Sequence, residues 1–429
     1  MSFYVIEAQL SDLGLTPISV ASRLGLEAVF LTSRIERYSD LATADEVFDK
    51  HVARIIQADT NDVASVLDAI RADSQGEPID GVFTTCDYNI VVMAEVAKAL
   101  SLRAISPSTA LKCRNKAETR HALDQAGVAI PGFVHARNEG ELETAVSTVG
   151  LPCVVKPMTE SASVDVRLCT SHDEVRSHFR VINDRKRDAR GQERPPGALI
   201  EQYLLGYEIS VETFSDAGTV TVLGVTDKRL GPTPVFAEIA DSFPSQLPES
   251  LLKNAIDTCL AGLEAVGHDF GAAHTEIRMV GGTAYIIEIN GRLGGDSIPH
   301  LLRGALAIDM MEQVVRLAAG MPVDLTRQAS RAAAWRDFSP AVGGRVREIR
   351  GVELAATTEG VVEVEIYAAP GVFLDAAQSN HQTFGHVLVV ADTTSEADRL
   401  AEVAANHVIV EFERDSISDV PTAARGIDP

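Results

Sequence analysis

Two kinds of apolar spacing alternate through the first hundred residues. Apolar runs typical of buried strands occur at 3–6, 28–32 and 80–85, and helical spacing occurs at 17–24, 61–72 and 89–100. This alternation predicts a parallel sheet covered by helices. A dinucleotide site on such a sheet would need G-x-G-x-x-G after the first strand, and Gly14 and Gly25 are too far apart to supply it. We therefore expect a Rossmann-like domain without the dinucleotide function.

The middle of the chain combines helical spacing with antiparallel β signals. Residues 106–128 are predicted to be helical, with Ser108 or Asn115 as a cap and Gly127 at the end. The charged segment 187–197 ends in Pro-Pro-Gly and is predicted to be a loop. The predicted strands are 151–157, 198–204, 207–214, 219–230 and a hairpin that turns at Gly281 and Gly282, and the predicted helices are 248–266 and 297–319.

The pattern of apolar and polar residues changes again after Gly320. The last part of the chain shows β-like runs at 344–352, 360–371 and 386–393, and a helical run at 395–408. Residues 419–429 have no periodicity and are expected to be frayed. We expect an α/β and α+β multidomain protein that ends in a small α+β domain.

Composition and charge narrow the classes of partner. The chain has 429 residues, 45% of them hydrophobic and 23% charged, an ordinary globular balance. A net charge of −23 repels phosphate backbones and argues against nucleic acid, although a basic pocket could still take a small phosphate ligand. The five cysteines form no C-x-x-C, which argues against disulfides or a zinc knuckle. With no signal-peptide pattern and no long apolar window, the expected location is the cytoplasm and no membrane is expected as a partner.

The predicted hairpin carries the most informative polar side chains. Residues two apart on a strand share a face, so Glu288 and Asn290 point the same way, and the partner strand can bring Glu276 beside them. Two carboxylates on an apolar sheet repel each other, and a divalent cation relieves that repulsion. Oxygen donors of this kind suit Mg²⁺ or Mn²⁺. The alternative is a set of solvated side chains on the outer face of the hairpin.

Other candidates depend more on context. Lys156 lies in an apolar strand, where its ammonium must either meet an anion or extend to the surface. The hydroxyl-rich segment 159–163 could offer donors to phosphate, and Glu208 could bind a ribose, but ordinary loops and edge strands look the same. Arg292 precedes Gly294 and Gly295, a combination that fits an anion site and also occurs in plain loops.

These segments, in this order, resemble the ATP-grasp superfamily, and in particular its carboxylate–amine ligases, the bacterial L-amino-acid ligases that make dipeptides. The motifs are N-K at 115–116, C-V-V-K-P at 153–157, I-E-Q-Y-L followed by G-Y-E within 200–208, H-T-E-I-R at 274–278 and I-E-I-N-G-R at 287–292. Each motif is weak alone, and the set in this order is specific. The resemblance covers nearly the whole chain. It implies a Rossmann-like pre-ATP-grasp domain (1–108), a central linker helix and lid subdomain (109–196), a nucleotide- and metal-binding subdomain (197–320) and a C-terminal α+β domain (321–429).

The resemblance also implies roles for single residues. Lys116 and Lys156 would contact the ATP phosphates, and Arg292 would steady an acyl phosphate, so that Lys156 and Arg292 are the expected catalytic residues. The remaining implied contacts are Glu201, Tyr203 and Leu204 with adenine, Glu208 with ribose, and Glu276, Glu288 and Asn290 with Mg²⁺ or Mn²⁺. Segment 159–163 takes the place of the phosphate-covering loop but lacks its glycines.

The expected substrate region lies mostly within 227–247. Related ligases carry a similar run with an acidic residue near Glu238, which is therefore the favoured substrate contact. Further candidates are Lys228, Arg229, Phe236, Ser242, His274, Arg292, Gly294, Gly295 and Asp296. His274 could instead orient Glu276 or be purely structural, and Glu238 could be a solvated charge in a Pro-bounded loop.

The implied activity is ATP-dependent amide formation between small amino-acid-like substrates through an acyl phosphate. The chemistry needs no nucleophilic side chain, because ATP activates the carboxylate and metal and cations stabilise the transferred phosphoryl group. Alternatives are a bicarbonate or purine-synthesis reaction on the same fold, a nucleotide-binding non-enzyme and, from the α/β start alone, a nicotinamide oxidoreductase. A homodimer is a common arrangement for such ligases.

Overall fold

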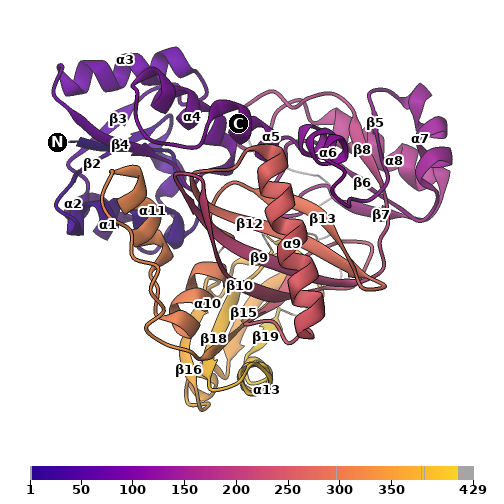
Figure 1. Ribbon diagram of the computed structural model, residues 1–429. Helices are drawn as coiled ribbons and strands as arrows, with labels where there is room; N and C mark the ends of the chain where they lie inside the picture. The colour runs from indigo at the N-terminus through magenta and orange to yellow at the C-terminus, as the bar shows by residue number, and fades with distance from the viewer. Residues whose placement is uncertain (1, 296, 378, 381, 414–429) are drawn as a thin grey trace.

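The computed structural model describes residues 2–295, 297–377, 379–380 and 382–413. Asp296 and the segment 419–429, which we expected to face substrate and to be frayed, lie outside the described residues. Figure 1 shows the N-terminal elements at one side, a small α/β unit at the other and a large twisted sheet between and below them. Among the described residues, no helix combines the length and the apolar character needed to cross a membrane.

The N-terminal part is the parallel sheet that the sequence predicts. Its strands lie in the order β3-β2-β1-β4 and cover β1 (Ser2–Ile6), β2 (Glu27–Thr32), β3 (Arg54–Gln57) and β4 (Ile79–Phe83). Four helices accompany it: α1 (Asp12–Arg23), α2 (Ala44–His51), α3 (Val63–Ser74) and α4 (Ile90–Ala99). Alternate residues of β1 enter two different cores, Phe3 on one face and Tyr4 on the other, so both faces of the sheet are covered.

A linker and a small antiparallel sheet follow. The linker is two helices, α5 (Pro107–Arg114) and α6 (Lys116–Gln125), where we expected one. Asn115 caps α6 as predicted, but Ser106 rather than Ser108 caps α5, because Pro107 takes the first helical position. The sheet has the order β5-β8-β6-β7, from β5 (Phe133–Ala136), β8 (Ala198–Gln202), β6 (Cys153–Lys156) and β7 (Arg167–Cys169), with α7 (Leu142–Val149) and α8 (His172–Asp184).

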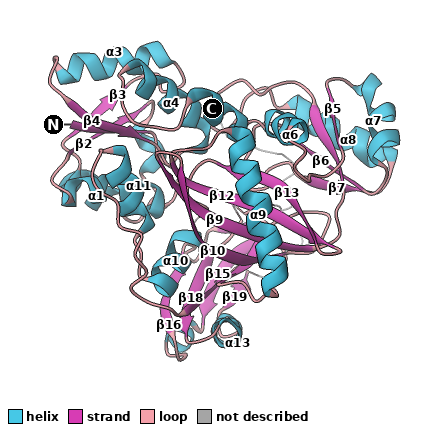
Figure 2. Cartoon of the chain, in the orientation of Figure 1, coloured by secondary structure: helices cyan, strands magenta, loops and turns pink. Residues whose placement is uncertain are grey.

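The central sheet has eight strands in the order β13-β12-β9-β10-β11-β14-β18-β16. The strands from the middle of the chain are β9 (Tyr207–Asp216), β10 (Thr219–Leu230), β11 (Glu238–Phe243), β12 (Gly271–Val280) and β13 (Thr283–Asn290). Figure 2 shows α9 (Glu249–Val266) crossing one face of β9, β12 and β13. Strand β11 replaces part of the loop expected within 227–247, because Ala240 and Phe243 are buried and pair it between β10 and β14.

The C-terminal part extends this sheet. Strands β14 (Ala332–Asp337), β18 (Gly385–Ala391) and β16 (Val361–Ile366) continue it beyond β11, and α13 (Thr394–Ala405) packs beside them. A smaller sheet, β17-β15-β19, accompanies them, with strands β15 (Gly344–Arg350), β17 (Phe373–Leu374) and β19 (Ile409–Phe412) and the short α12 (Val352–Ala356). One sheet therefore joins strands from the middle of the chain with strands from its C-terminal part.

The helix predicted over 297–319 is two helices. These are α10 (Ser297–Leu306) and α11 (Met310–Ala318). The break occurs at Ala307, whose φ of 57° lies in the left-handed region, and Asp309 then caps α11 by accepting from the Glu312 N–H. The break lets α10 pack on β14 and β11 of the central sheet and α11 pack on α1 and β4 of the N-terminal part, within one continuous core.

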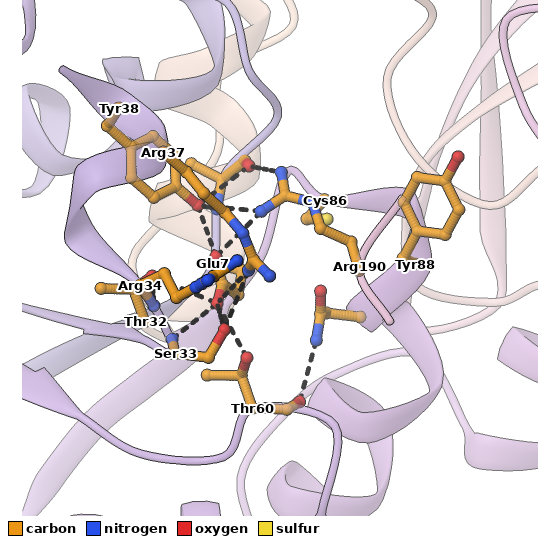
Figure 3. Close-up of polar contacts among 12 residues, drawn as sticks. Glu7, Thr32, Ser33, Arg34, Arg37, Tyr38, Thr60, Cys86, Tyr88 and Arg190 are labelled. Carbon is orange, nitrogen blue, oxygen red and sulfur yellow. Dashed lines mark hydrogen bonds and ion pairs between the residues drawn. The ribbon is translucent and has the colours of Figure 1, made fainter. Parts of the chain in front are cut away.

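A buried ion pair ties the loop 185–197 to the N-terminal domain. Arg190 Nη1 lies 3.0 Å from Glu7 Oε2, and Arg190 Nη2 donates to the Ala8 carbonyl at 2.6 Å. Figure 3 shows Tyr38, Ser33 and Thr60 also converging on Glu7, and each donates a hydrogen bond to its carboxylate. These donors and Arg190 overcome the cost of burial and lower the pKa of Glu7. The loop is therefore anchored through a charge that the N-terminal domain has fully desolvated.

Replacing Arg190 by methionine is expected to release this loop. Breaking a buried pair by removing one partner costs about 3–5 kcal/mol, so the free energy of unfolding should fall and trypsin should cut within 185–194 faster. Thermal unfolding and limited proteolysis measure both effects. The control is Arg187→Met, since the exposed Arg187 guanidinium donates to the Gly191 carbonyl within the same loop. Equal cleavage rates in the two variants would show that Arg190 is not the anchor.

Candidate functional site

Strand alternation gives β9, β10, β12 and β13 one polar and one apolar face. The apolar face packs with α9 in a core that includes Ile209, Ile277 and Leu263. The polar face carries Glu208, Ser210, Glu212, Lys228, His274, Glu276, Arg278, Glu288 and Asn290. Glu276 pairs with Glu288 across the hairpin and with Ser210 on the other side. The structure thus brings the two carboxylates and Asn290 onto one face, as the hairpin pattern predicts.

Cationic side chains lie close to the carboxylates of this face. Lys116 Nζ lies 2.8 Å from Glu288 Oε1, and Lys228 Nζ lies 3.8 Å from Glu276 Oε1. Despite the cost of burial, Lys228 and His274 hold the pKa of Glu276 well below its usual range. The Glu276 carboxylate is therefore ionised at neutral pH. Two carboxylates and an amide oxygen side by side form a donor set that fits Mg²⁺.

His274 orients one of these carboxylates. Its Nδ1 lies 3.0 Å from Glu212 Oε1, and its Nε2 lies 3.4 Å from Glu276 Oε1. Burial opposes the charged imidazole, but Glu212 and Glu276 outweigh it and raise the pKa of His274 to about 9. Of the alternatives open from the sequence, the geometry favours positioning of Glu276 over contact with substrate. Glu212 was not among the residues predicted for the site. It follows Glu208 and Ser210 at the same two-residue spacing along β9, so the alternation could have identified it.

A second cluster carries excess positive charge. Glu201 lies between two cations, with Arg120 Nε and Lys156 Nζ each 2.6 Å from one of its oxygens. All three side chains are buried, so Lys156 does not extend to the surface. Burial lowers the pKa of Lys156, and Glu201 opposes that shift. Among the described residues, Arg120 Nη1 is buried without a hydrogen-bond partner. A buried cluster with more cations than anions and an unused donor is suited to a phosphate.

The residues that the resemblance implies for nucleotide binding differ in whether their main chain or side chain already has a partner. Strand β8 is paired on both sides, to β5 and β6, so the main chain of Glu201 lies within the sheet, and the ladder ends at Gln202. Tyr203 and Leu204 follow it, and the Tyr203 ring lies 6.3 Å from that of Phe236. Glu208 is buried and pairs with Arg278, a partner the sequence did not suggest. Desolvation raises the pKa of Glu208 to about 7.

Arg292 is held by the N-terminal domain. Its Nε and Nη2 donate to the two oxygens of Asp87 at 2.6 and 2.8 Å. Although burial opposes ionisation, Arg292 holds the pKa of the Asp87 carboxyl well below its usual range. Arg292 and Gly294 line a cavity of about 70 Å³ together with Thr84 and Phe270. Nothing in the local sequence marks Asp87, because only the tertiary fold brings it to Arg292.

The residues of the expected substrate region point in two directions. Glu238 Oε2 lies 2.9 Å from the buried Lys228 Nζ, on the site face, and Glu238 is partly exposed. Arg229 lies 3.6 Å from Glu402, and Ser242 donates to Asp398, so both face α13 instead. The expectation that Arg229 and Ser242 reach the site is wrong. The reason is strand geometry, because neighbouring residues such as Lys228 and Arg229 lie on opposite faces.

We expect a side chain to be tolerated at Gly295 but not at Gly294. A Cβ at Gly294 would lie 2.8 Å from His274 Nδ1 and 2.6 Å from Ile298 Cγ1, whereas a Cβ at Gly295 would meet open space. Gly294→Ala should therefore displace His274 or α10 and destabilise the chain by about 1–3 kcal/mol. Thermal unfolding compares it with Gly295→Ala as the control. Equal stability of the two variants would contradict this packing.

Three family models match the chain in succession. They are the ATP-grasp N-terminal domain over residues 18–102, the ATP-grasp domain over 149–300 and the L-amino acid ligase C-terminal domain 2 over 336–413. The five cysteines, at positions 86, 113, 153, 169 and 259, are all free and buried.

Known proteins and structures agree with these matches. An uncharacterized protein of Sinorhizobium fredii is 27% identical over 92% of this chain and 80% of its own. Carnosine synthase 1 of Homo sapiens is 28% identical over 60% of this chain, which covers only 33% of that longer protein. The crystal structure of L-amino acid ligase from Bacillus licheniformis superposes with a TM-score of 0.79 at 23% identity, over 96% of this chain and 99% of that one. The chain therefore carries the N-terminal and central domains of ATP-grasp proteins and a C-terminal domain of the L-amino acid ligase type, and it shares the fold of an L-amino acid ligase.

Proposed function

We propose that the protein joins the carboxylate of one small amino-acid-like substrate to the amine of another, at the expense of ATP. The carboxylate attacks the γ-phosphorus of ATP, ADP leaves, and an acyl phosphate forms. The amine then attacks the acyl carbon, and phosphate leaves with the former carboxylate oxygen. The observation that carries the proposal is the single polar sheet face on which Glu276 lies opposite Glu288, with Lys116 2.8 Å from Glu288.

The side chains of the site divide the binding of ATP between them. Glu276, Glu288 and Asn290 would hold Mg²⁺, which neutralises phosphate charge when bound. Lys116 and Lys156 would bind the phosphates, and the excess charge around Glu201 supports this role. The adenine would contact the main chain of Tyr203 and Leu204 beyond β8. Glu208 would bind the ribose, for which it must exchange its contact with Arg278.

Positioning of the acyl phosphate would depend on Arg292. The Asp87 carboxylate fixes the Arg292 guanidinium through two parallel hydrogen bonds. Because the guanidinium is already oriented, binding an anion costs little further side-chain entropy. Such preorganised charge is usually a large contribution to phosphoryl transfer. Gly294 and Gly295 leave the main chain open beside it. The adjoining cavity of about 70 Å³ supports a small apolar side chain on one substrate.

A product screen tests this proposal. Phosphate release would be measured with ATP, Mg²⁺ and a matrix of amino-acid pairs, and products would be identified by mass spectrometry. The expected result is release that needs two amino-acid-like partners, with a product mass equal to their sum minus water. Turnover stimulated only by bicarbonate with biotin, or by aminoimidazole substrates, would contradict the proposal and select another ATP-grasp reaction.

Replacing Glu238 by alanine is expected to alter substrate preference more than ATP use. Its carboxylate is partly exposed on the site face and is a suitable partner for a substrate ammonium. We expect the KM for one amino-acid substrate to rise by about 10–100-fold, which is the effect of losing one contact in a substrate pocket. The KM for ATP should change little. Arg229→Ala is the control, because Arg229 faces α13. An effect of Glu238→Ala on the KM for ATP alone would remove Glu238 from the substrate site.

A further inference from the structure

A cluster of histidine and glutamate side chains lies at the far edge of the central sheet. Glu363 and Glu365 are two apart on the edge strand β16 and share a face, and Glu365 pairs in register with His386 on β18. One ligand atom from each of these three residues lies within 4.8 Å of the other two. Strands β14, β11 and β10 separate β18 from β9, so this cluster is distinct from the candidate ATP site.

The His386 imidazole is buried and fixed on three sides. Only 1% of His386 is exposed. The Trp335 ring stacks on it with centroids 3.7 Å apart and planes inclined by 13°. The Tyr367 hydroxyl lies 2.5 Å from Nδ1, which leaves Nε2 directed at Glu363 Oε1, 3.3 Å away. Metal-binding histidines have this arrangement, in which a second group holds the nitrogen that does not ligate.

The separation between nitrogen and oxygen also fits a metal ion. Two ligands bonded to Zn²⁺ at ~2.0–2.1 Å in a tetrahedral site lie ~3.3 Å apart. That is the distance between His386 Nε2 and Glu363 Oε1, which is long for a hydrogen bond to a carboxylate. The other Glu363 oxygen lies 3.3 Å from His300 Nδ1 on α10, so a second imidazole restrains the same carboxylate.

We propose that Glu363, Glu365 and His386 bind a divalent transition-metal ion such as Zn²⁺. Imidazole and carboxylate ligands together suit this class of ion, and three protein ligands leave a position for water. Tyr367 and His300 act as positioning residues for His386 and Glu363. The ion would connect the edge of the sheet to α10 through His300, and α10 begins just after the Gly294–Gly295 loop. This role is structural and does not depend on the proposed ligase reaction.

Cobalt titration of the full chain tests the proposal. Co²⁺ is the probe, because its visible absorption reports ligand geometry directly, and the titration uses a Glu288→Gln background to weaken the candidate Mg²⁺ site. One equivalent of Co²⁺ should give an absorption band and raise the unfolding temperature. Glu365→Gln should lose both effects. Tyr367→Phe should weaken Co²⁺ affinity by about 10–100-fold, the usual effect of removing a group that orients a ligand.

A matched histidine–glutamate pair provides the control. His172 Nδ1 lies 3.2 Å from Glu143 Oε2 at an exposed surface, and the described residues offer no third ligand there. His172→Gln should leave the absorption band and the unfolding temperature unchanged. An unchanged band in Glu365→Gln, a band lost in His172→Gln, or no Co²⁺ binding at all would each overturn the proposal, and the last result would reduce the cluster to a hydrogen-bond network.

Discussion

Replacing Glu288 by glutamine is expected to abolish Mg²⁺-dependent turnover while the chain stays folded. The amide keeps an oxygen that can accept from Lys116, and Lys116 also donates to the Glu160 carbonyl at 2.7 Å, so the local packing survives. What is lost is a charged metal ligand. A catalytic metal supplies several kcal/mol of charge stabilisation, which corresponds to a rate loss of about 10³-fold or more.

Steady-state phosphate release at several Mg²⁺ concentrations measures this loss. Excess Mg²⁺ should restore little of the rate, because the remaining donors at Glu276 and Asn290 hold less negative charge. Glu264→Gln, an exposed carboxylate on α9, makes the same change in net charge and should leave turnover unaffected. Full activity of Glu288→Gln would remove the metal assignment from the hairpin.

Replacing Glu201 by glutamine is expected to destabilise the folded chain strongly. Glu201 neutralises Arg120 and Lys156 through contacts of 2.6 Å each, and all three side chains are buried. Its removal leaves two buried cations without an anion. Breaking a buried pair costs about 3–5 kcal/mol, so the unfolding temperature should fall by several degrees, since ~1 kcal/mol shifts it by ~2–4 °C in a large domain.

The same variant separates a phosphate-binding role from a purely structural one. If Lys156 and Arg120 bind phosphate, ADP should raise the unfolding temperature of Glu201→Gln more than that of the unchanged chain. The anionic phosphates would then replace the missing carboxylate. Thermal unfolding with and without ADP and Mg²⁺ makes the comparison. An equal shift in both proteins would mean that the nucleotide does not reach this cluster.

Local strand geometry explains what the sequence could predict about the site. The two-residue period places Glu288 beside Asn290, and the Gly281–Gly282 turn opposes them to Glu276, so one hairpin defines the carboxylate group. The same period could have separated Arg229 from Lys228 and could have added Glu212 to Glu208. Those two errors came from not applying the alternation to the predicted strand 219–230 and from stopping the motif at Glu208.

Tertiary contacts explain what the sequence could not predict. Asp87 reaches Arg292 from a different domain, and Arg120 reaches Glu201 from the linker helix, with no local pattern that connects them. The long helical run 297–319 keeps its spacing across Ala307, where the chain breaks so that α10 packs on β14 and β11 while α11 packs on α1 and β4. The joining of β14, β18 and β16 to the central sheet likewise depends on strand order, which spacing does not encode.

The measurement that tests the central claim most directly follows the substrate oxygen. An amino acid with oxygen-18 in its carboxylate would be turned over with ATP, Mg²⁺ and a second amino acid. If ATP activates the carboxylate as an acyl phosphate, one oxygen-18 of the substrate carboxylate should appear in the inorganic phosphate released for each product molecule formed. Mass spectrometry of the phosphate detects this label. Release of unlabelled phosphate during product formation, or release of AMP and pyrophosphate, would contradict the account.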